Sequence, residues 1–261
     1  MHRNLSAKVA RSALQRPVHI ESKETAAGLQ GNVHAVVDHP LAEVRAVLAN
    51  ASQWCEMLLL HINNRRCRSG REPEGDLLTL SVVRRYDKSV EEAFELPFIL
   101  RTTGDAQDYL AVDLSAVTGP LGTSQYRVML EAVPLDERRT FLHFGYAYDH
   151  NTMARLATMA YLATFGSHKV GFTVVGKRPD GGPEYIRGLR GLMERNAMRY
   201  FLTLDAYLAG IGLPANEQFD ARLHRWFEGV ERYPPQLHEV DLAPRLALKR
   251  ADRQRGAGTA R

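Results

Sequence analysis

The residues best suited to bind or transform a small molecule are aromatic and histidine side chains in the segment FLHFGYAYDH (141–150). Alternate side chains of a β-strand share a face, so Phe144, Tyr146 and Tyr148 would point one way and His143 the other. If the aromatic set faces inward, two phenol hydroxyls enter an apolar interior and need partners that a bound ligand could supply. Otherwise these tyrosines pair with protein groups or lie in solvent at the strand end.

Arginines on a long predicted helix, residues 186–209, form a second candidate. Arg195 and Arg199 are four residues apart and share a helical face. One of them could bind a carboxylate or phosphate of a ligand, because the guanidinium fork matches those groups. The alternative is a solvated face or a salt bridge with acids of the strands.

The sequence lacks the familiar catalytic motifs: Gly-x-Ser-x-Gly, a phosphate loop, Gly-x-Gly-x-x-Gly and His-Glu-x-x-His. An enzyme would therefore need an acid–base group in a cavity, for which His143, His150 and Tyr146 are the candidates. We expect no cofactor and no metal, because the two cysteines with the nearby His61 leave a tetrahedral site one ligand short.

Composition places the chain among ordinary globular proteins. It has 261 residues, 44% apolar and 25% charged, and a net charge of +4. The excess positive charge lies in the two ends, so we expect a partly disordered basic segment over 1–30, a disordered basic tail over 241–261 and no nucleic-acid partner. No apolar run is long enough to span a membrane, and the N-terminus lacks the apolar core of a signal peptide. The lack of a signal peptide is consistent with a cytoplasmic protein and also with a chain that begins inside a longer exported precursor.

The order of elements follows from periodicity and turn residues. An alternating strand in GNVHAVVDHP is followed by two short helices and then by strand-like runs separated by turns. We place these six strands at 64–69, 77–86, 93–103, 109–118, 125–134 and 139–149. A helix near 152–165, a hairpin around Asp180-Gly181-Gly182, the long helix and a last amphipathic helix at 216–231 complete the chain.

This layout resembles the helix-grip fold of the START-like (SRPBCC) superfamily of lipid carriers, polyketide cyclases and plant pathogenesis-related proteins. The residues that carry the resemblance are VHAVVDHPLAEVRAVLANASQWCEMLLLHINNRRC (33–67) and EYIRGLRGLMERNAMRYFLTLDAYL (184–208). The resemblance implies an α+β fold in which a curved antiparallel sheet of about seven strands surrounds a long C-terminal helix. It covers a domain at 31–210; a helix–hairpin insertion at 152–185, which could act as a lid, and a helical extension at 211–240 depart from it.

The resemblance also implies a function: binding, or transport, of a lipid or another small hydrophobic molecule in a cavity between the sheet and the long helix. A cyclase, dehydratase or hydrolase acting in the same cavity, and an interaction module with basic tails, remain alternatives. We expect transient membrane contact and no obligate protein partner. The expected ligand-binding residues are Tyr126, Phe144, Tyr146, Tyr148, Tyr161, Met193, Arg195, Arg199 and Tyr200.

Within this resemblance, the only two cysteines fall on neighbouring elements. Cys55 would lie on the second short helix and Cys67 on the strand that follows it. A helix that doubles back into a strand can bring such positions within disulfide reach. A structural disulfide and two reduced buried thiols both fit, with redox or metal roles as lesser alternatives. A disulfide would indicate an exported protein, because the cytosol keeps thiols reduced.

Overall fold

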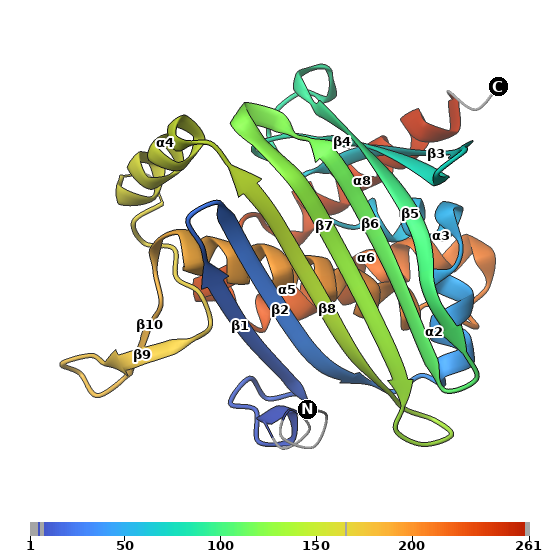
Figure 1. The fold of residues 1–261 in the computed structure, drawn as a ribbon, viewed down its shortest axis with the longest axis horizontal. Coiled ribbons are helices and arrows are strands. Elements are labelled where there is room, and N and C mark those ends of the chain that lie inside the picture. The colour runs from blue at the N-terminus through green and yellow to red at the C-terminus, as the bar shows by residue number, and fades with distance from the viewer. Residues whose placement is uncertain (1–4, 6–7, 165, 259–261) are drawn as a thin grey trace.

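The structure is a computed structural model that describes residue 5, residues 8–164 and residues 166–258. Its centre is one antiparallel sheet with the strand order β1-β2-β8-β7-β6-β5-β4-β3. The strands are β1 (Val18–Glu24), β2 (Gly28–Val37), β3 (Asn64–Glu72), β4 (Gly75–Val82), β5 (Phe94–Ala106), β6 (Tyr109–Thr118), β7 (Thr123–Pro134) and β8 (Thr140–His150). The expected α+β arrangement of a curved sheet and a long helix is confirmed, with eight strands in place of about seven (Figure 1).

The additional strand is β1, which lies in the segment expected to be partly disordered. It pairs with β2 from Val18, opposite Ala35, to Glu24, opposite Leu29. Val18 and Ile20 are buried and alternate with more exposed neighbours, as in a strand with one face on the core. The sequence of this segment alternates as a strand does, but the basic residues around it led to the prediction of partial disorder.

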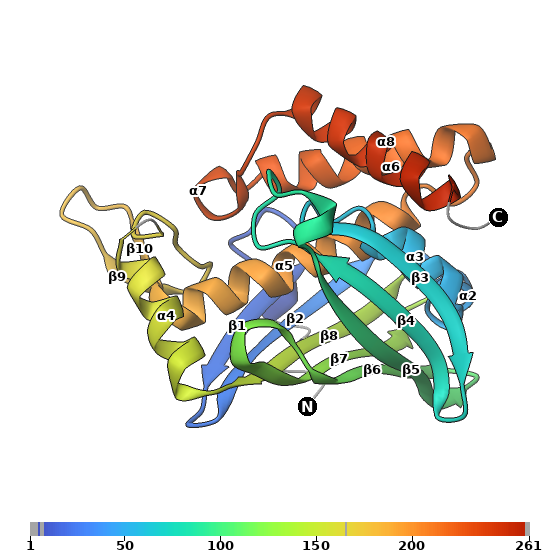
Figure 2. The same ribbon diagram turned by 90° about the horizontal axis from the view of Figure 1, so that it is seen from above.

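Helices cover the concave face of the sheet in two layers (Figure 2). The first layer contains α2 (Leu41–Leu48), α3 (Ala51–Leu58) and α5 (Gly188–Leu208). The α5 helix packs on β1, β2 and β8, and it comes closest at Gly31. A Cβ atom there would lie 3.0 Å from Met193 and 3.1 Å from Ala197. Glycine thus allows the long helix to approach the sheet closely.

The second layer contains α6 (Ala215–Glu231), α7 (Pro234–Leu237) and α8 (Leu242–Gly258), which lie behind α5. The expectation of a disordered tail from residue 241 is wrong for the described residues, because α8 is helical to Gly258. Arg245, Lys249 and Asp252 recur at helical spacing and are all buried. The buried face of this helix therefore includes charged side chains. A search for apolar residues at helical spacing does not detect a face of this kind. Residues 259–261 of the expected tail lie outside the described residues.

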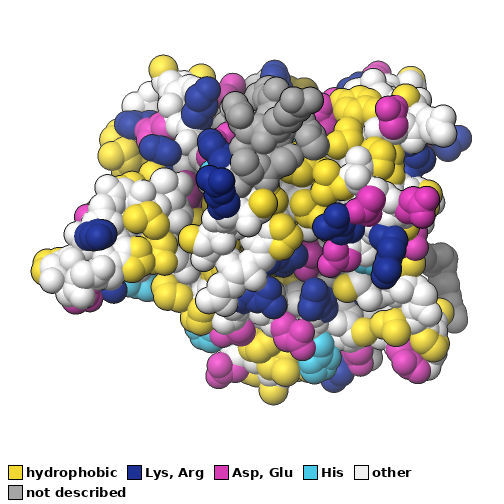
Figure 3. Space-filling view, turned by 90° about the horizontal axis from the view of Figure 1, so that it is seen from below, with side chains coloured by type: hydrophobic (Ala, Val, Ile, Leu, Met, Phe, Trp, Pro, Cys, Tyr) yellow, Lys and Arg dark blue, Asp and Glu magenta, His cyan; other side chains and the backbone are white. Residues whose placement is uncertain are grey.

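The insertion contains α4 (Thr152–Ala163) and a separate hairpin of β9 (Val174–Lys177) and β10 (Pro183–Tyr185). Both lie at one end of the sheet, beyond the ends of β8 and α5 (Figure 1). The N-terminus of α4 is capped by Asn151, whose Oδ1 accepts a hydrogen bond from the Ala154 amide at 2.8 Å. In the space-filling view, the hairpin projects from a surface where basic and acidic side chains are interspersed (Figure 3).

The two cysteines form a disulfide, with Cys55 on α3 and Cys67 on β3 and their Cα atoms 5.1 Å apart. The bond joins the helical end of the core to the edge strand of the sheet. The loop between them is pinned again by Asn64, whose side-chain amide donates to the Leu58 carbonyl at 2.9 Å.

Candidate functional site

Four tyrosines meet where the sheet faces α5, and we call them the tyrosine cluster: Tyr126, Tyr146, Tyr148 and Tyr200. The ring centroids of Tyr126 and Tyr148 lie 5.3 Å apart, and those of Tyr146 and Tyr200 lie 5.4 Å apart. Such separations are typical of favourable aromatic pairs. All four were predicted from the sequence as ligand-binding residues, and the structure brings them together.

A β-bulge in β7 directs Tyr126 into this cluster. The pairing of β7 with β8 shifts register between Ser124 and Arg127, and Gln125 within the bulge has a φ of 51°. A bulge re-aims the side chains beside it. The Tyr126 hydroxyl donates to Thr123 Oγ1 at 2.9 Å, and that threonine in turn donates to the Pro120 carbonyl at 2.5 Å.

Two hydroxyls of the tyrosine cluster have no hydrogen-bond partner in the described part of the chain, namely those of Tyr146 and Tyr148. Burial raises the pKa of both phenols, and for Tyr146 it does so well above the ordinary value. Both therefore stay protonated at neutral pH. They are suited to donate a hydrogen bond to a ligand oxygen or nitrogen and unsuited to act as bases.

On one side of the tyrosine cluster lies a closed cavity between the sheet and α5. Its volume is about 30 Å³, enough for a water molecule and far below that of a ligand. Its walls include Trp54, Met57, Leu80, Phe98, Leu114 and Phe144. The space between sheet and long helix, where the sequence placed the ligand, is thus nearly filled by large side chains.

On the other side lies an open groove with a volume of about 640 Å³, which we call the outer groove. This volume is within the range of small-molecule sites. Tyr126, Tyr146 and Tyr148 form its base, and residues 120–123 and α4 form its walls. Two of these tyrosines, Tyr126 and Tyr146, also border the inner cavity, so the tyrosine cluster separates the two spaces.

The rim of the outer groove is the glycine-bearing loop GPLGTSQY (119–126) packed against the start of α4. Gly122 has a φ of 81°, and a Cβ atom there would lie 2.5 Å from Asn151 Nδ2. Only glycine allows this close approach, which the 2.9 Å hydrogen bond from the Asn151 amide to the Gly122 carbonyl completes. Leu121 beside it is 55% exposed and has a φ of 57°.

The α4 helix, which contributes one wall of the outer groove, carries several exposed large apolar side chains. Met153 is 74% exposed, Leu156 53%, Met159 43% and Tyr161 47%. Arg155 is the one charged residue of this helix, and its guanidinium pairs with Glu24 at 2.8 Å. Of these four exposed side chains, Met153 and Tyr161 line the outer groove, whereas Leu156 and Met159 do not. Methionine suits such a wall because its side chain adapts to irregular surfaces.

The predicted histidines are not among the residues that line the outer groove. His143 is on the opposite face of β8, where its ring nitrogens contact Glu131 at 2.9 Å and Asn32 at 3.0 Å. His150 lies at the end of β8, and its buried Nε2 has no partner among the described residues. Neither lines the groove or the inner cavity.

The predicted arginines also point elsewhere. Both are buried on α5; Arg195 donates to the Val170 carbonyl at 3.5 Å, and Arg199 pairs with Glu239, between α7 and α8, at 2.6 Å. Met193 packs against Gly31 of β2. Asn196, one residue after Arg195, lines the outer groove, as does Arg84; neither was among the predicted site residues. Helical spacing groups residues onto a face, but it does not show which neighbour that face contacts.

The described residues hold no group of three or more His, Cys, Asp or Glu side chains that could bind a metal ion. Among their helices, none combines the length and the apolar character needed to cross a lipid bilayer.

Comparison with known proteins finds similarity of fold alone. No family model matches the sequence, and no curated protein matches it significantly. Ara h 8.0201 is similar in structure with a TM-score of 0.39 and 8% identity, over 74% of this chain and 98% of that one. Norcoclaurine synthase from Thalictrum flavum has a TM-score of 0.34 and 12% identity, over 57% of this chain and 76% of that one. A conserved protein from Geobacillus kaustophilus has a TM-score of 0.39 and 10% identity, over 69% of this chain and 95% of that one. These values are too low to carry an argument about activity.

Proposed function

We propose that this protein binds a small, mainly apolar molecule in the outer groove and that the tyrosine cluster recognises a hydrogen-bond acceptor on it. The observation that carries the proposal is the pair of buried phenols, Tyr146 and Tyr148, at the base of an apolar groove. Neither hydroxyl is among the buried polar atoms that lack a partner, so both keep contact with solvent in the open groove, and a ligand acceptor would replace that water with a direct hydrogen bond.

The remaining walls support the same ligand chemistry. The α4 face supplies apolar contact, while Thr158, Asn151 and Asn196 supply a few polar atoms. Small-molecule sites commonly combine mostly apolar walls with a small number of placed polar groups. The ligand class that fits is an amphipathic molecule with an apolar body and one or two acceptor oxygens, such as a carbonyl or an ether.

The groups available at the groove favour the proposal of binding over one of catalysis. The phenols there are held protonated by burial, and the histidines that could serve as bases lie outside it. Proton transfer needs a group whose pKa is near the working pH. The groove offers hydrogen-bond donors of the kind that fix a ligand's orientation.

Titration with Nile red, a neutral apolar dye that carries a carbonyl acceptor, tests this proposal. We expect saturable binding to the wild-type protein and a three- to tenfold weaker affinity for Tyr146→Phe and Tyr148→Phe, since one hydrogen bond contributes about 1 kcal/mol. Tyr109→Phe is the matched control, because its hydroxyl bonds to Glu131 at 2.7 Å on the other face of the sheet. Equal affinity in all four proteins would remove the phenols from the site.

A further inference from the structure

Cationic side chains gather between α5 and the segment that joins α7 to α8. We call Lys169, Arg195, Arg199 and Arg245 the basic cluster. The three arginines are each at most 5% exposed, and Lys169 is partly buried. Facing them is Glu239, whose Oε1 lies 2.6 Å from Arg199 Nη2. Glu239 thus pairs with Arg199, and its charge also acts on Lys169, Arg195 and Arg245.

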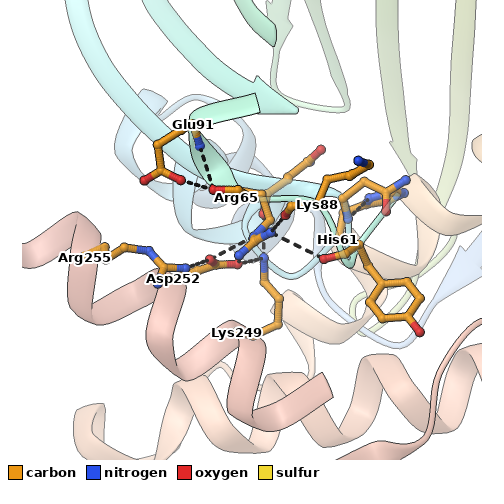
Figure 4. Close-up of polar contacts among 11 residues, drawn as sticks. His61, Arg65, Lys88, Glu91, Lys249, Asp252 and Arg255 are labelled. Carbon is orange, nitrogen blue, oxygen red and sulfur yellow. Dashed lines mark hydrogen bonds and ion pairs between the residues drawn. The ribbon is translucent and has the colours of Figure 1, made fainter. Parts of the chain in front are cut away.

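The other carboxylates near the basic cluster are engaged elsewhere. Glu194 accepts hydrogen bonds from Ser22, from the amides of Phe172 and Thr173 and from the Thr173 hydroxyl. Asp252 binds Arg65, Lys249 and Arg255, which converge on it from β3 and α8 (Figure 4). Glu231 pairs with His238 at 2.9 Å. The charges of Glu194 and Glu231 still act on Arg195 and Arg245, and Glu239 is the carboxylate that pairs directly with a member of the basic cluster.

Burial, together with the charge of neighbouring cations, lowers the pKa values of Arg195 and Arg245. Burial, and then the charge of Arg199, lower the pKa of Arg195 to about 10. Burial also lowers the pKa of Arg245 well below its ordinary value, with Glu239 opposing the shift. Buried charges of one sign are costly unless an opposite charge compensates them.

Several hydrogen-bond donors in this region have no acceptor. The Nε atoms of Arg199 and Arg245 are buried and unpartnered among the described residues, as are Trp226 Nε1 and His61 Nε2. These groups adjoin one another: the Arg245 guanidinium lies 3.4 Å from the Trp226 ring centroid, and His61 meets that ring edge-on at 6.2 Å. His61 Nδ1 accepts from the Asn63 amide at 3.2 Å, which leaves the Nε2 position to carry the proton.

The chain itself presents oxygens to the basic cluster. Arg199 donates to the Leu237 carbonyl at 3.4 Å, and Lys169 donates to the His238 carbonyl at 3.0 Å. Together with the Glu239 carboxylate, segment 237–239 offers three groups of oxygen atoms to cationic donors. The Glu239 side chain is 25% exposed, so a solute can reach this position from solvent.

We propose that the basic cluster is a binding site for a compact oxyanion of the phosphate type, and that Glu239 occupies it in part as a tethered carboxylate. Guanidinium groups match the tetrahedral oxygens of phosphate and can bind two of them at once. An added oxyanion would balance the excess positive charge and accept hydrogen bonds from the donors that have no partner. This site is separate from the outer groove and does not depend on it.

Calorimetric titration with inorganic phosphate at constant ionic strength tests the proposal. We expect one phosphate per chain, and about tenfold tighter binding to Glu239→Gln, because the competing negative charge is gone. Arg199→Gln should abolish binding. Arg250→Gln is the matched control, since Arg250 is an exposed arginine of α8 that pairs with Asp220 at 2.8 Å, and it should bind phosphate as the wild type does.

A thermal melt provides the second readout. Glu239→Gln should melt at a lower temperature than the wild type, and phosphate should restore the difference while chloride of equal ionic strength does not. Vesicles with and without phosphatidic acid distinguish a lipid headgroup, which would retain the protein on the vesicles, from a free ion. The proposal is overturned if neither wild type nor Glu239→Gln binds phosphate, or if Arg199→Gln or, should it not fold, Arg195→Gln binds it unchanged.

Discussion

Tyr146 and Tyr148 lie two residues apart on β8, with ring centroids 5.9 Å apart, and both end in hydroxyls without partners among the described residues. They share the inner face of the strand and form the base of the outer groove. Their neighbour Tyr126 has a partner in Thr123. The proposed ligand site rests on this contrast within one cluster.

The hydroxyls of these two tyrosines should contribute little to the stability of the empty protein. We expect Tyr146→Phe to change the free energy of unfolding by less than about 0.5 kcal/mol, because the substitution removes a hydroxyl that has no protein partner and keeps contact with solvent. Tyr109→Phe, which loses a bond to Glu131, should be less stable than the wild type. Urea unfolding measures both, and a clear loss of stability in Tyr146→Phe would show that its hydroxyl is already satisfied.

The disulfide should contribute substantially to stability. The Cys55–Cys67 bond closes a loop with a sequence separation of 12 residues. Closing such a loop stabilises by about 3 kcal/mol through its effect on the unfolded chain. We expect the Cys55→Ala/Cys67→Ala variant to lose about that much in urea unfolding, and the reduced wild type to match it. No difference between the oxidised and reduced wild type would contradict the prediction.

The buried carboxylate of Asp252 should hold α8 on the body of the protein. Replacing Asp252 with asparagine leaves Lys249 and Arg65 buried without a counter-charge, a change that typically costs about 3–5 kcal/mol. Asp220→Asn removes an exposed carboxylate that also pairs with α8, at Arg250, and should change stability little. Hydrogen exchange should become faster in α8 of the first variant alone; equal exchange in both would refute the docking role.

Stability should fall as the pH drops below about 6.5. Burial, and then the charge of His143, lower the pKa of His34 from 6.5 to about 4, against the opposing effect of Glu21. The unfolded chain binds a proton at His34 before the folded one does, so the contribution is complete above pH 6.5 and is lost toward pH 4. His34→Gln should reduce the slope of stability against pH over this window, whereas the exposed His224→Gln should not. Equal slopes in all three proteins would contradict the assignment.

Much of the fold could be predicted from the sequence because its pattern is local. Leu110, Val112 and Leu114 alternate with more polar residues, and the structure places all three in the core of the sheet. The stripe of the long helix from Leu189 to Leu208 likewise predicted a helix that packs on a large apolar surface. Period and turn residues are enough for such elements.

The candidate site could be predicted only in part. The inward alternation of Tyr146 and Tyr148 was readable, but the bulge at Gln125 that directs Tyr126 depends on how two strands pair. The direction of Arg199 depends on a second helical layer, which charged residues of α8 help to dock. The location of the groove depends on side-chain volume. Large side chains nearly fill the space between the sheet and α5, so the open space lies at the end of the sheet.

Native mass spectrometry of the purified protein tests the central claim, that the outer groove binds a small molecule. Ala157 lines the groove, whereas Ala160 on the same helix is exposed and does not line it. We predict a small-molecule adduct on the wild type and on Ala160→Trp that denaturation removes, and a weaker adduct on Ala157→Trp, whose indole occupies part of the groove. A wild type without an adduct, or an equal adduct on Ala157→Trp, would contradict the account.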